Sequence, residues 1–76
     1  MDKILITGSN GFLGSHLIDK SIEENYIVYG LDRQSSSFRN LVKYTNGKET
    51  FTKKNKVNFL GKKIQIESNR KNLIFL

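Results

Sequence analysis

A chain of 76 residues, 37% hydrophobic and 26% charged, has the composition of a folded protein rather than of a disordered one. Its length allows one modest core and excludes a core with an enclosed catalytic cleft, because so short a chain buries only about 60% of its unfolded surface. The absence of cysteine excludes disulfides, thiolate metal sites and a cysteine nucleophile. Since there is also only 1 histidine, we expect no metal site.

The net charge of +6 is unevenly distributed along the chain. Residues 1–38 carry three basic and five acidic side chains, whereas residues 39–76 carry ten basic and two acidic ones. Such an asymmetry fits either a basic segment that binds nucleic acid or another polyanion, or a truncated chain whose acidic remainder is missing. No apolar run is long enough for a membrane span or a signal peptide, so we predict a soluble, cytoplasmic protein without a membrane partner.

The first half of the chain predicts a strand, a glycine-rich turn, a helix and a second strand. Residues 3–7 are apolar on both faces, as in a buried parallel strand. A helical period begins at about Gly11, and Asn25 is suited to the left-handed position that closes a helix. Residues 26–31 then predict a second strand, parallel to the first. The apolar face of the helix would comprise Leu13, Leu17, Ile18, Ser21 and Ile22.

A basic segment over residues 33–56 separates the second strand from the rest of the chain. Residues 38–44 have the apolar spacing of a short helix, and Asn46-Gly47 indicates a turn. Residues 48–56 are polar and rich in lysine, so we predict a loop there.

Residues 57–76 are predicted to hold a third strand and the start of another helix. The apolar run at 57–60 predicts the strand, with a hairpin between 57–60 and 64–67 as the alternative. Residues 69–76 predict the helix, with Asn69 as its N-cap. The expected fold class is therefore α/β, with a three-stranded parallel sheet.

Three glycines lie between the first strand and the first helix with the spacing G-x-x-G-x-x-G. Gly8 would let the chain leave the strand in a tight turn, Gly11 would leave room for a pyrophosphate, and Gly14 would let the helix pack closely. The free N–H groups and the positive end of the helix dipole would hold the phosphates. This turn indicates a dinucleotide site; a plain strand–turn–helix with the same glycines is the structural alternative.

An acidic residue follows the second strand, at the position where dinucleotide-binding folds carry one. Asp32 lies about 20 residues beyond the glycine turn, and its carboxylate would accept hydrogen bonds from the ribose hydroxyls of the adenosine. Glycines, helix and acid in this order indicate a Rossmann-type βαβ unit over residues 1–32, and the whole chain would form part of a Rossmann fold.

The segment from Ile4-Leu5-Ile6-Thr7-Gly8 to Gly14-Ser15-His16-Leu17 resembles the N-terminus of the extended short-chain dehydrogenases/reductases. These form the NAD-dependent epimerase/dehydratase family, which acts mostly on nucleotide sugars. The resemblance covers residues 3–32 and implies an NAD or NADP cofactor. The residues that we expect to bind the dinucleotide are Gly8, Ser9, Asn10, Gly11, Phe12, Leu13, Gly14, Asp32, Arg33 and Ile64.

The loop after the second strand bears on the choice of cofactor. Asp32-Arg33-Gln34-Ser35-Ser36-Ser37-Phe38 is similar to the loop of GDP-mannose 4,6-dehydratases, in which the arginine and serines hold the 2′-phosphate of NADP. Asp32 favours NAD because a carboxylate repels a 2′-phosphate, whereas Arg33 favours NADP by pairing with it. We predict NAD, with NADP as the alternative.

Two features of the resembled family differ here. Family members carry Asp-Ile/Leu-x-Asp after the third strand; the aligned stretch Lys63-Ile64-Gln65-Ile66 keeps only the apolar Ile64, which would line the adenine pocket. The catalytic Tyr-x-x-x-Lys of the family falls beyond residue 76, so we predict no catalytic residue in this chain. Tyr44 and Lys48 have that spacing, but Asn46-Gly47 between them disfavours the helix that would align them.

These observations favour the N-terminal, cofactor-binding portion of a nucleotide-sugar epimerase or dehydratase that is not itself catalytic. A free-standing nucleotide-binding module and a basic nucleic-acid-binding protein are the alternatives. In a complete sheet the first strand is central, with strands on both sides. Here one of its edges would be exposed and apolar, so we predict self-association through that edge.

Overall fold

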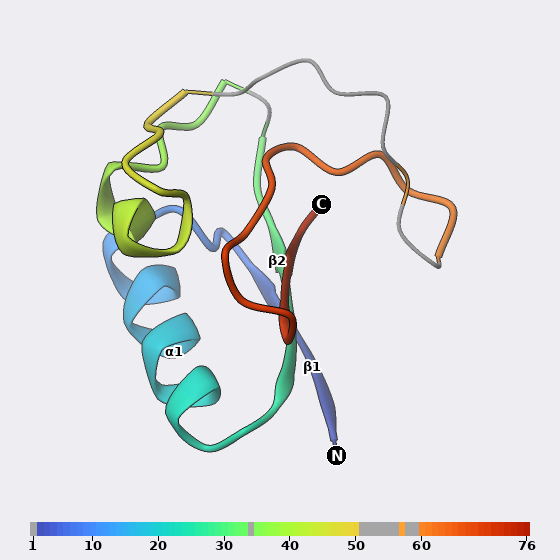
Figure 1. Cartoon of the computed structure of the whole chain (residues 1–76). Helices are drawn as coiled ribbons and strands as arrows, with labels where there is room; N and C mark the ends of the chain where they lie inside the picture. Colours follow the sequence, from blue (N-terminus) through green and yellow to red (C-terminus); the bar gives the residue numbers. More distant parts are fainter. Residues whose placement is uncertain (1, 34, 51–56, 58–59) are drawn as a thin grey trace.

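The fold is that of a computed structural model, which describes residues 2–33, 35–50, 57 and 60–76. Its elements in chain order are β1 (Lys3–Thr7), α1 (Phe12–Glu23), β2 (Ile27–Leu31), the 3₁₀ helix η1 (Arg39–Tyr44) and β3 (Leu73–Phe75) (Figure 1). The strands form one parallel sheet in the order β1-β2-β3, with α1 connecting β1 to β2. The predicted α/β class and three-stranded parallel sheet are confirmed, in the arrangement of a partial Rossmann fold. No helix among the described residues is long and apolar enough to cross a membrane.

The βαβ unit forms where the sequence predicts it. β1 and β2 pair in parallel, with Ile4 beside Val28 and Ile6 beside Gly30. α1 ends as predicted: Asn25 has a φ of +63°, and its N–H donates to the Ile22 carbonyl at 3.0 Å.

The buried face of α1 differs from the predicted one. Ile18 and Ile22 are buried against the sheet, whereas Leu13 and Leu17 are 72% and 47% exposed. The helix buries one stripe over β1 and β2, and these two leucines lie outside it. Their predicted place on the packed face of the helix is wrong, because among the described residues the sheet ends at β1 and nothing lies beside that flank.

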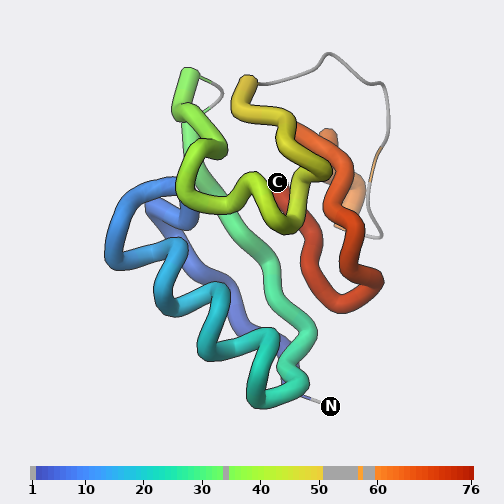
Figure 2. The backbone as a smooth tube through the Cα atoms, turned by 60° about the vertical axis from the view of Figure 1, so that its left-hand side comes forward, coloured from blue at the N-terminus to red at the C-terminus, as the bar shows by residue number. Residues whose placement is uncertain are grey.

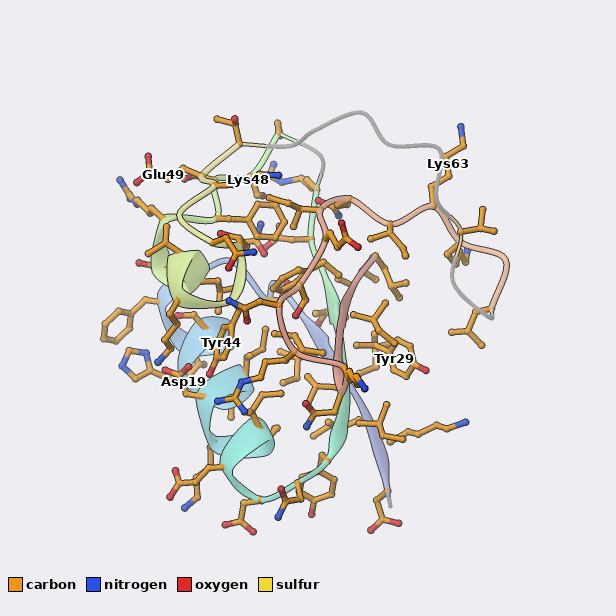
Figure 3. The ribbon with its side chains drawn as sticks, viewed as in Figure 1. Asp19, Tyr29, Tyr44, Lys48, Glu49 and Lys63 are labelled. Atoms are coloured by element: carbon orange, nitrogen blue, oxygen red, sulfur yellow. The ribbon has the colours of Figure 1, made fainter. Side chains whose placement is uncertain are left out.

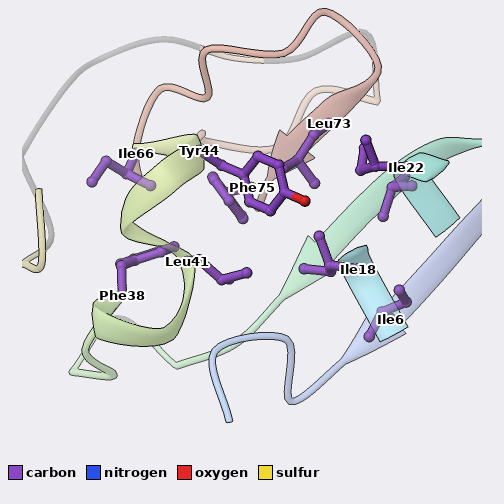
Figure 4. Packing of buried hydrophobic residues seen from close by; sticks show 10 residues of the cluster. Ile6, Ile18, Ile22, Phe38, Leu41, Tyr44, Ile66, Leu73 and Phe75 are labelled. Carbon is purple, nitrogen blue, oxygen red and sulfur yellow. The ribbon is translucent and has the colours of Figure 1, made fainter. Parts of the chain in front are cut away.

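The core lies between the sheet and the layer formed by α1 and η1 (Figure 2). Within it, the rings of Phe38 and Phe75 meet edge to face with their centroids 5.0 Å apart. Figure 4 shows how residues from every element of the fold converge here. The buried residues of this cluster are Ile6, Ile18, Ile22, Val28, Phe38, Leu41, Tyr44, Ile66, Leu73 and Phe75.

The third strand is not where the sequence predicts it. β3 pairs in parallel with β2, with Leu73 beside Val28 and Phe75 beside Gly30. In the predicted strand 57–60, residues 58–59 lie outside the described residues, and Leu60 lies in a turn. Val57 forms an isolated antiparallel bridge with Lys63. Among the described residues, this bridge is the only pairing that resembles the alternative hairpin between 57–60 and 64–67.

The helix predicted from residue 69 does not form. The Asn69 side-chain amide donates to the Lys43 carbonyl at 2.7 Å and to Asn46 Oδ1 at 3.1 Å, so it caps no helix. Leu73 and Phe75 are buried and Ile74 between them is half-buried, which is the alternation of a strand. A run of three apolar residues is too short for periodicity to decide between strand and helix, and here pairing with β2 decides.

The segment between β2 and β3 contains the predicted short helix. Residues 38–44 were expected to be helical, and η1 confirms this with 3₁₀ geometry and a kink at Leu41. Asn46 and Gly47 have φ angles of +55° and +84°, as the predicted turn requires. Of the predicted loop 48–56, residues 51–56 lie outside the described residues.

A polar contact ties η1 to α1 at the margin of the core (Figure 3). The Tyr44 hydroxyl donates to Asp19 Oδ1 at 2.7 Å, and Lys43 Nζ lies 2.9 Å from the same oxygen. Partial burial raises the pKa of Asp19, but the hydrogen bond from Tyr44 and the hydrogen bond and charge of Lys43 outweigh it, so the net pKa is lowered. Burial, the hydrogen bond to Asp19 and the charge of Asp19 raise the pKa of Tyr44 to about 12.

Removing the Tyr44 hydroxyl is expected to destabilise the fold and to change its alkaline pH profile. Because the pKa of Tyr44 rises from 10.0 to about 12 on folding, its contribution is complete below pH 10.0 and is lost toward pH 12. Tyr44→Phe should lower the free energy of unfolding by about 1 kcal/mol at neutral pH and lack this alkaline loss. Urea unfolding across the pH range measures both, with Tyr26→Phe as the matched control. An alkaline loss of equal size in Tyr44→Phe and the wild type would contradict this assignment.

Candidate functional site

The glycine-rich turn leaves β1 at Gly8 and enters α1 after Gly11. Gly8 has a φ of +64°, in the left-handed region that favours glycine, and the Gly11 N–H donates to the Gly8 carbonyl at 3.1 Å. The Ser15 N–H makes the first helical hydrogen bond, to the Gly11 carbonyl at 2.9 Å. No side chain of a described residue caps α1, so the first N–H groups of the helix keep their capacity to bind an anion.

The glycines at 11 and 14 differ in what a side chain would meet. A Cβ at Gly14 would lie 2.1 Å from the Gly8 carbonyl oxygen, so α1 packs too closely on the turn for any side chain there. A Cβ at Gly11 would lie 3.4 Å from the same oxygen, and the φ of −75° at Gly11 is open to all residues. The fold itself therefore requires glycine at 14 but not at 11, where bare backbone leaves space for a ligand.

Asp32 lies across the turn, just beyond the end of β2. Its Oδ2 accepts the Asn10 N–H at 2.9 Å, and its Oδ1 accepts the Ser36 hydroxyl at 2.7 Å and the Arg33 N–H at 2.8 Å. Partial burial raises the pKa of Asp32, but these hydrogen bonds and the charge of Arg33 outweigh it, so the net pKa is lowered. The carboxylate is therefore ionised at neutral pH, and it joins the glycine turn to the carboxyl end of β2.

An open hollow of about 420 Å³ lies beside the turn, within the range of small-molecule sites. Its charged groups differ in what they can bind: the Asp32 carboxylate accepts hydrogen bonds, whereas Arg33 and Arg39 attract anions. The hollow is lined by Gly8, Asn10, Gly11, Phe12, Asp32, Arg33, Ser36, Ser37, Arg39 and Asn40.

The structure brings most of the predicted site residues to this hollow, but not all of them. Ser9 and Gly14 are buried where the turn packs on α1 and β2. Leu13 is exposed on α1 and is not among the lining residues, whereas Phe12 lines the hollow and is 76% exposed. Ile64 lines a separate hollow of about 210 Å³ against β3.

The alignment on which the Ile64 prediction rested is wrong. Residues 63–66 precede β3, so they do not follow the third strand as the family's acidic pair does. The amide of Gln65 instead donates to the Asp32 carbonyl, and the Gln65 N–H donates to the Phe75 carbonyl at 3.3 Å. This stretch is therefore hydrogen-bonded to the residue that follows β2 and to β3. An adenine contact by Ile64 stays a prediction.

Arg39 and Asn40 line the hollow without having been predicted as binding residues. The Asn40 amide donates to the Asn10 carbonyl at 3.1 Å, across 30 positions of sequence. Asn10 Nδ2 is buried beside the hollow and has no hydrogen-bond partner among the described residues. Arg39 closely follows the serines at 35–37, and this proximity in sequence could have marked it as a binding residue. No sequence pattern marks Asn40, because only the folded chain brings it to the turn.

Tyr44 and Lys48 are not aligned on one helix. η1 ends at Tyr44, and left-handed residues at 46 and 47 separate it from Lys48 (Figure 3). The Tyr44 hydroxyl donates to Asp19, and a pKa raised to about 12 is the reverse of what a tyrosine base needs. This geometry supports the prediction that the pair is not catalytic.

Comparisons with known proteins point to one family. A putative UDP-glucose 4-epimerase of Methanocaldococcus jannaschii is 51% identical over 37 residues, which cover 49% of this chain and 12% of that protein. Aldehyde reductase 2 of Sporidiobolus salmonicolor is 40% identical over 45 residues, 59% of this chain and 13% of that protein. Protein CapI of Staphylococcus aureus is 43% identical over 54 residues, 66% of this chain and 16% of that protein. No solved structure matches the chain.

The chain therefore spans only a small part, 12% to 16%, of the length of these relatives. The family model of GDP-mannose 4,6 dehydratase, by contrast, matches nearly the whole chain, over residues 5–74. That match includes the glycine turn, Asp32 and most of β3. The chain belongs to the GDP-mannose 4,6 dehydratase family, as an N-terminal portion of its epimerase/dehydratase domain.

Proposed function

We propose that this chain binds a dinucleotide, NAD by preference, at the hollow beside the glycine turn. The observation that carries the proposal is the hydrogen bond of 2.9 Å from the Asn10 N–H to Asp32, which joins the turn and the acid at one site. The pyrophosphate would lie against the backbone at Gly11 and the start of α1. The adenosine ribose would donate its hydroxyls to Asp32.

Three features of the site fit such a cofactor. The backbone at Gly11 is bare, Asp32 is ionised, and Asn10 Nδ2 is a buried donor without a partner among the described residues. When bound, the nicotinamide would supply hydride chemistry, and the residues of this chain would hold and orient the adenosine and pyrophosphate. Gly8, Ser9 and Gly14 would shape the turn, and Phe12, Leu13 and Ile64 stay proposed contacts.

NADP is the second candidate cofactor, because Arg33 and Arg39 line the same hollow as Asp32. Two guanidinium groups near a ribose site would suit a 2′-phosphate. Against this, the ionised Asp32 would repel that phosphate, and the Ser36 hydroxyl already donates to Asp32. We therefore keep NAD as the proposed cofactor.

In a complete protein of this family, this portion would serve an enzyme that oxidises and reduces a nucleotide sugar in the cytoplasm, with its catalytic Tyr-x-x-x-Lys supplied elsewhere. A free-standing binding module would show the same cofactor affinity and no activity. A nucleic-acid-binding protein would instead show binding by its basic residues that weakens steeply with salt. For the exposed edge of β1 we propose a second partner, another copy of the chain.

Replacing Asp32 by asparagine is expected to reduce the preference for NAD. Asparagine keeps an acceptor for the Asn10 N–H but removes the charge that binds ribose hydroxyls and repels a 2′-phosphate. NAD affinity should fall roughly 10- to 100-fold, the loss expected for charged hydrogen bonds, while NADP affinity should not fall. Isothermal titration calorimetry with both dinucleotides measures this.

Asp19→Asn is the matched control, because it removes a carboxylate that lies outside the hollow. It should leave both affinities unchanged. Equal NAD affinity in the wild type and in Asp32→Asn would contradict the proposed role of Asp32. Tighter binding of NADP than of NAD by the wild type would instead favour the arginines as the determinant.

A further inference from the structure

We propose that the Ser36 hydroxyl competes with the adenosine ribose for Asp32, so that Ser36 lowers the preference of this site for NAD over NADP. The inference rests on the proposed dinucleotide site and concerns the ligand-free state of its acidic residue. Ser36 lines the hollow beside the glycine turn, and its hydroxyl donates to Asp32 Oδ1 at 2.7 Å. The same carboxylate would accept the ribose hydroxyls of NAD. A serine hydroxyl and a ribose hydroxyl are the same kind of donor, so they compete for it.

The Asp32 carboxylate has few free acceptor positions. Its two oxygens offer about four lone-pair positions for hydrogen bonds. Among the described residues, three donors use them: the Asn10 N–H at Oδ2, and the Arg33 N–H and the Ser36 hydroxyl at Oδ1. This leaves about one free position, on Oδ2, whereas two ribose hydroxyls that bind side by side need two. One of the three donors must therefore leave before both hydroxyls can bind.

Of these donors, the Ser36 hydroxyl is the one that can leave without a change in the backbone. The Asn10 N–H is fixed by the glycine turn, which a backbone hydrogen bond of 3.1 Å closes. The Arg33 N–H belongs to the residue directly after Asp32, so it stays near that carboxylate. The Ser36 hydroxyl, by contrast, turns about its side-chain bond while its own N–H stays bonded to the Arg33 carbonyl at 3.0 Å. Because the hollow is open to solvent, water can hydrogen-bond to the released hydroxyl.

The competition affects the two dinucleotides unequally. NAD carries two free hydroxyls on its adenosine ribose, whereas in NADP one of them carries the phosphate. The single ribose hydroxyl that remains in NADP can use the free position on Oδ2 while Ser36 stays on Oδ1. NAD makes its second hydrogen bond to Asp32 only after Ser36 has left. Ser36 therefore weakens the binding of NAD but not that of NADP.

Replacing Ser36 by alanine tests this competition. Without the hydroxyl, Asp32 can accept both ribose hydroxyls at once, so NAD affinity should rise roughly two- to tenfold, the net worth of one hydrogen bond. NADP affinity should not rise. Isothermal titration calorimetry of the whole chain with both dinucleotides measures this, with circular dichroism to verify the fold. Ser35→Ala is the matched control and should leave NAD affinity unchanged, because Ser35 is exposed in the same loop and does not line the hollow.

A measurement without cofactor tests the contact itself. The Ser36 hydroxyl donates one of the hydrogen bonds that lower the pKa of Asp32, so this pKa should be higher in Ser36→Ala than in the wild type. Ser35→Ala should leave the pKa of Asp32 as it is in the wild type. Carbon NMR of the Asp32 carboxyl group during an acid titration measures the pKa in all three proteins.

The two measurements together distinguish a failure of this inference from a failure of the proposed function. An unchanged Asp32 pKa, or a wild type that binds NAD at least as tightly as Ser36→Ala does, would overturn the competition and leave the proposed cofactor site unaffected. An equal rise in NAD and NADP affinity would overturn the effect of Ser36 on cofactor preference. If neither the wild type nor Ser36→Ala bound either dinucleotide, the proposed function would be contradicted, and the competition with it.

Discussion

Replacing Gly14 by alanine is expected to remove a large part of the stability of the fold. The new Cβ would lie 2.1 Å from the Gly8 carbonyl oxygen, 2.8 Å from the Gly8 carbonyl carbon and 2.9 Å from Ser9 Cα. All of these are backbone atoms, so α1 would have to move away from the turn and lose its packing on the sheet. Overpacking of this kind costs about 1–3 kcal/mol or more, and so small a domain has only about 5 kcal/mol in total.

Gly11→Ala is the matched control, because it adds the same methyl group to the same turn at an ordinary contact of 3.4 Å. It should keep the free energy of unfolding of the wild type to within about 0.5 kcal/mol, yet lose NAD affinity, because the methyl group occupies the space of the pyrophosphate. Urea unfolding followed by circular dichroism measures stability. If Gly14→Ala unfolded at the wild-type urea concentration, the close packing of α1 on the turn would be contradicted.

Replacing Phe75 by alanine is expected to have a comparable effect through the core. Phe75 is 1% exposed, meets the Phe38 ring edge to face, and lies beside Gly30, where a Cβ would come within 3.2 Å of its ring. Truncating a buried phenylalanine costs about 3–5 kcal/mol, which approaches the whole stability of the domain. We expect β3 to detach or the chain to unfold, as read by amide hydrogen exchange and thermal unfolding.

Phe12→Ala is the control for Phe75→Ala, because Phe12 is 76% exposed. Its loss should change the free energy of unfolding by no more than about 0.5 kcal/mol. The comparison also tests the position of the third strand. Equal stability of the two variants would mean that residues 73–75 do not complete the sheet.

The first 32 residues could be predicted from sequence because their signals are local. Each of these signals can be read from a few neighbouring residues: the apolar run of the strand, the glycine spacing, the helical period and the Asn25 that ends the helix. The third strand could not be placed, because the apolar runs at 57–60 and 73–75 are both short and only pairing with β2 selects the second one. The exposure of Leu13 was missed for a related reason: helical periodicity gives an apolar face but not the width of the sheet beneath it.

The candidate site likewise contains residues that the sequence could predict and residues that it could not. Gly8, Gly11 and Asp32 were predicted together because their order along the chain is itself the fingerprint, and the structure brings them to one hollow. Asn40 and Gln65 were not predicted, because their hydrogen bonds to the turn and to Asp32 span 30 and 33 positions. Contacts over such distances leave no pattern in a single sequence.

The central claim is that the glycine turn and Asp32 together bind a dinucleotide. The most direct test is a titration of the whole chain with NAD, followed by two-dimensional amide NMR. We predict a dispersed spectrum in which the amides of Gly8, Gly11, Gly14 and Asp32 shift saturably, with NADP giving weaker binding. A dispersed spectrum in which these four amides do not respond to either dinucleotide would contradict the account.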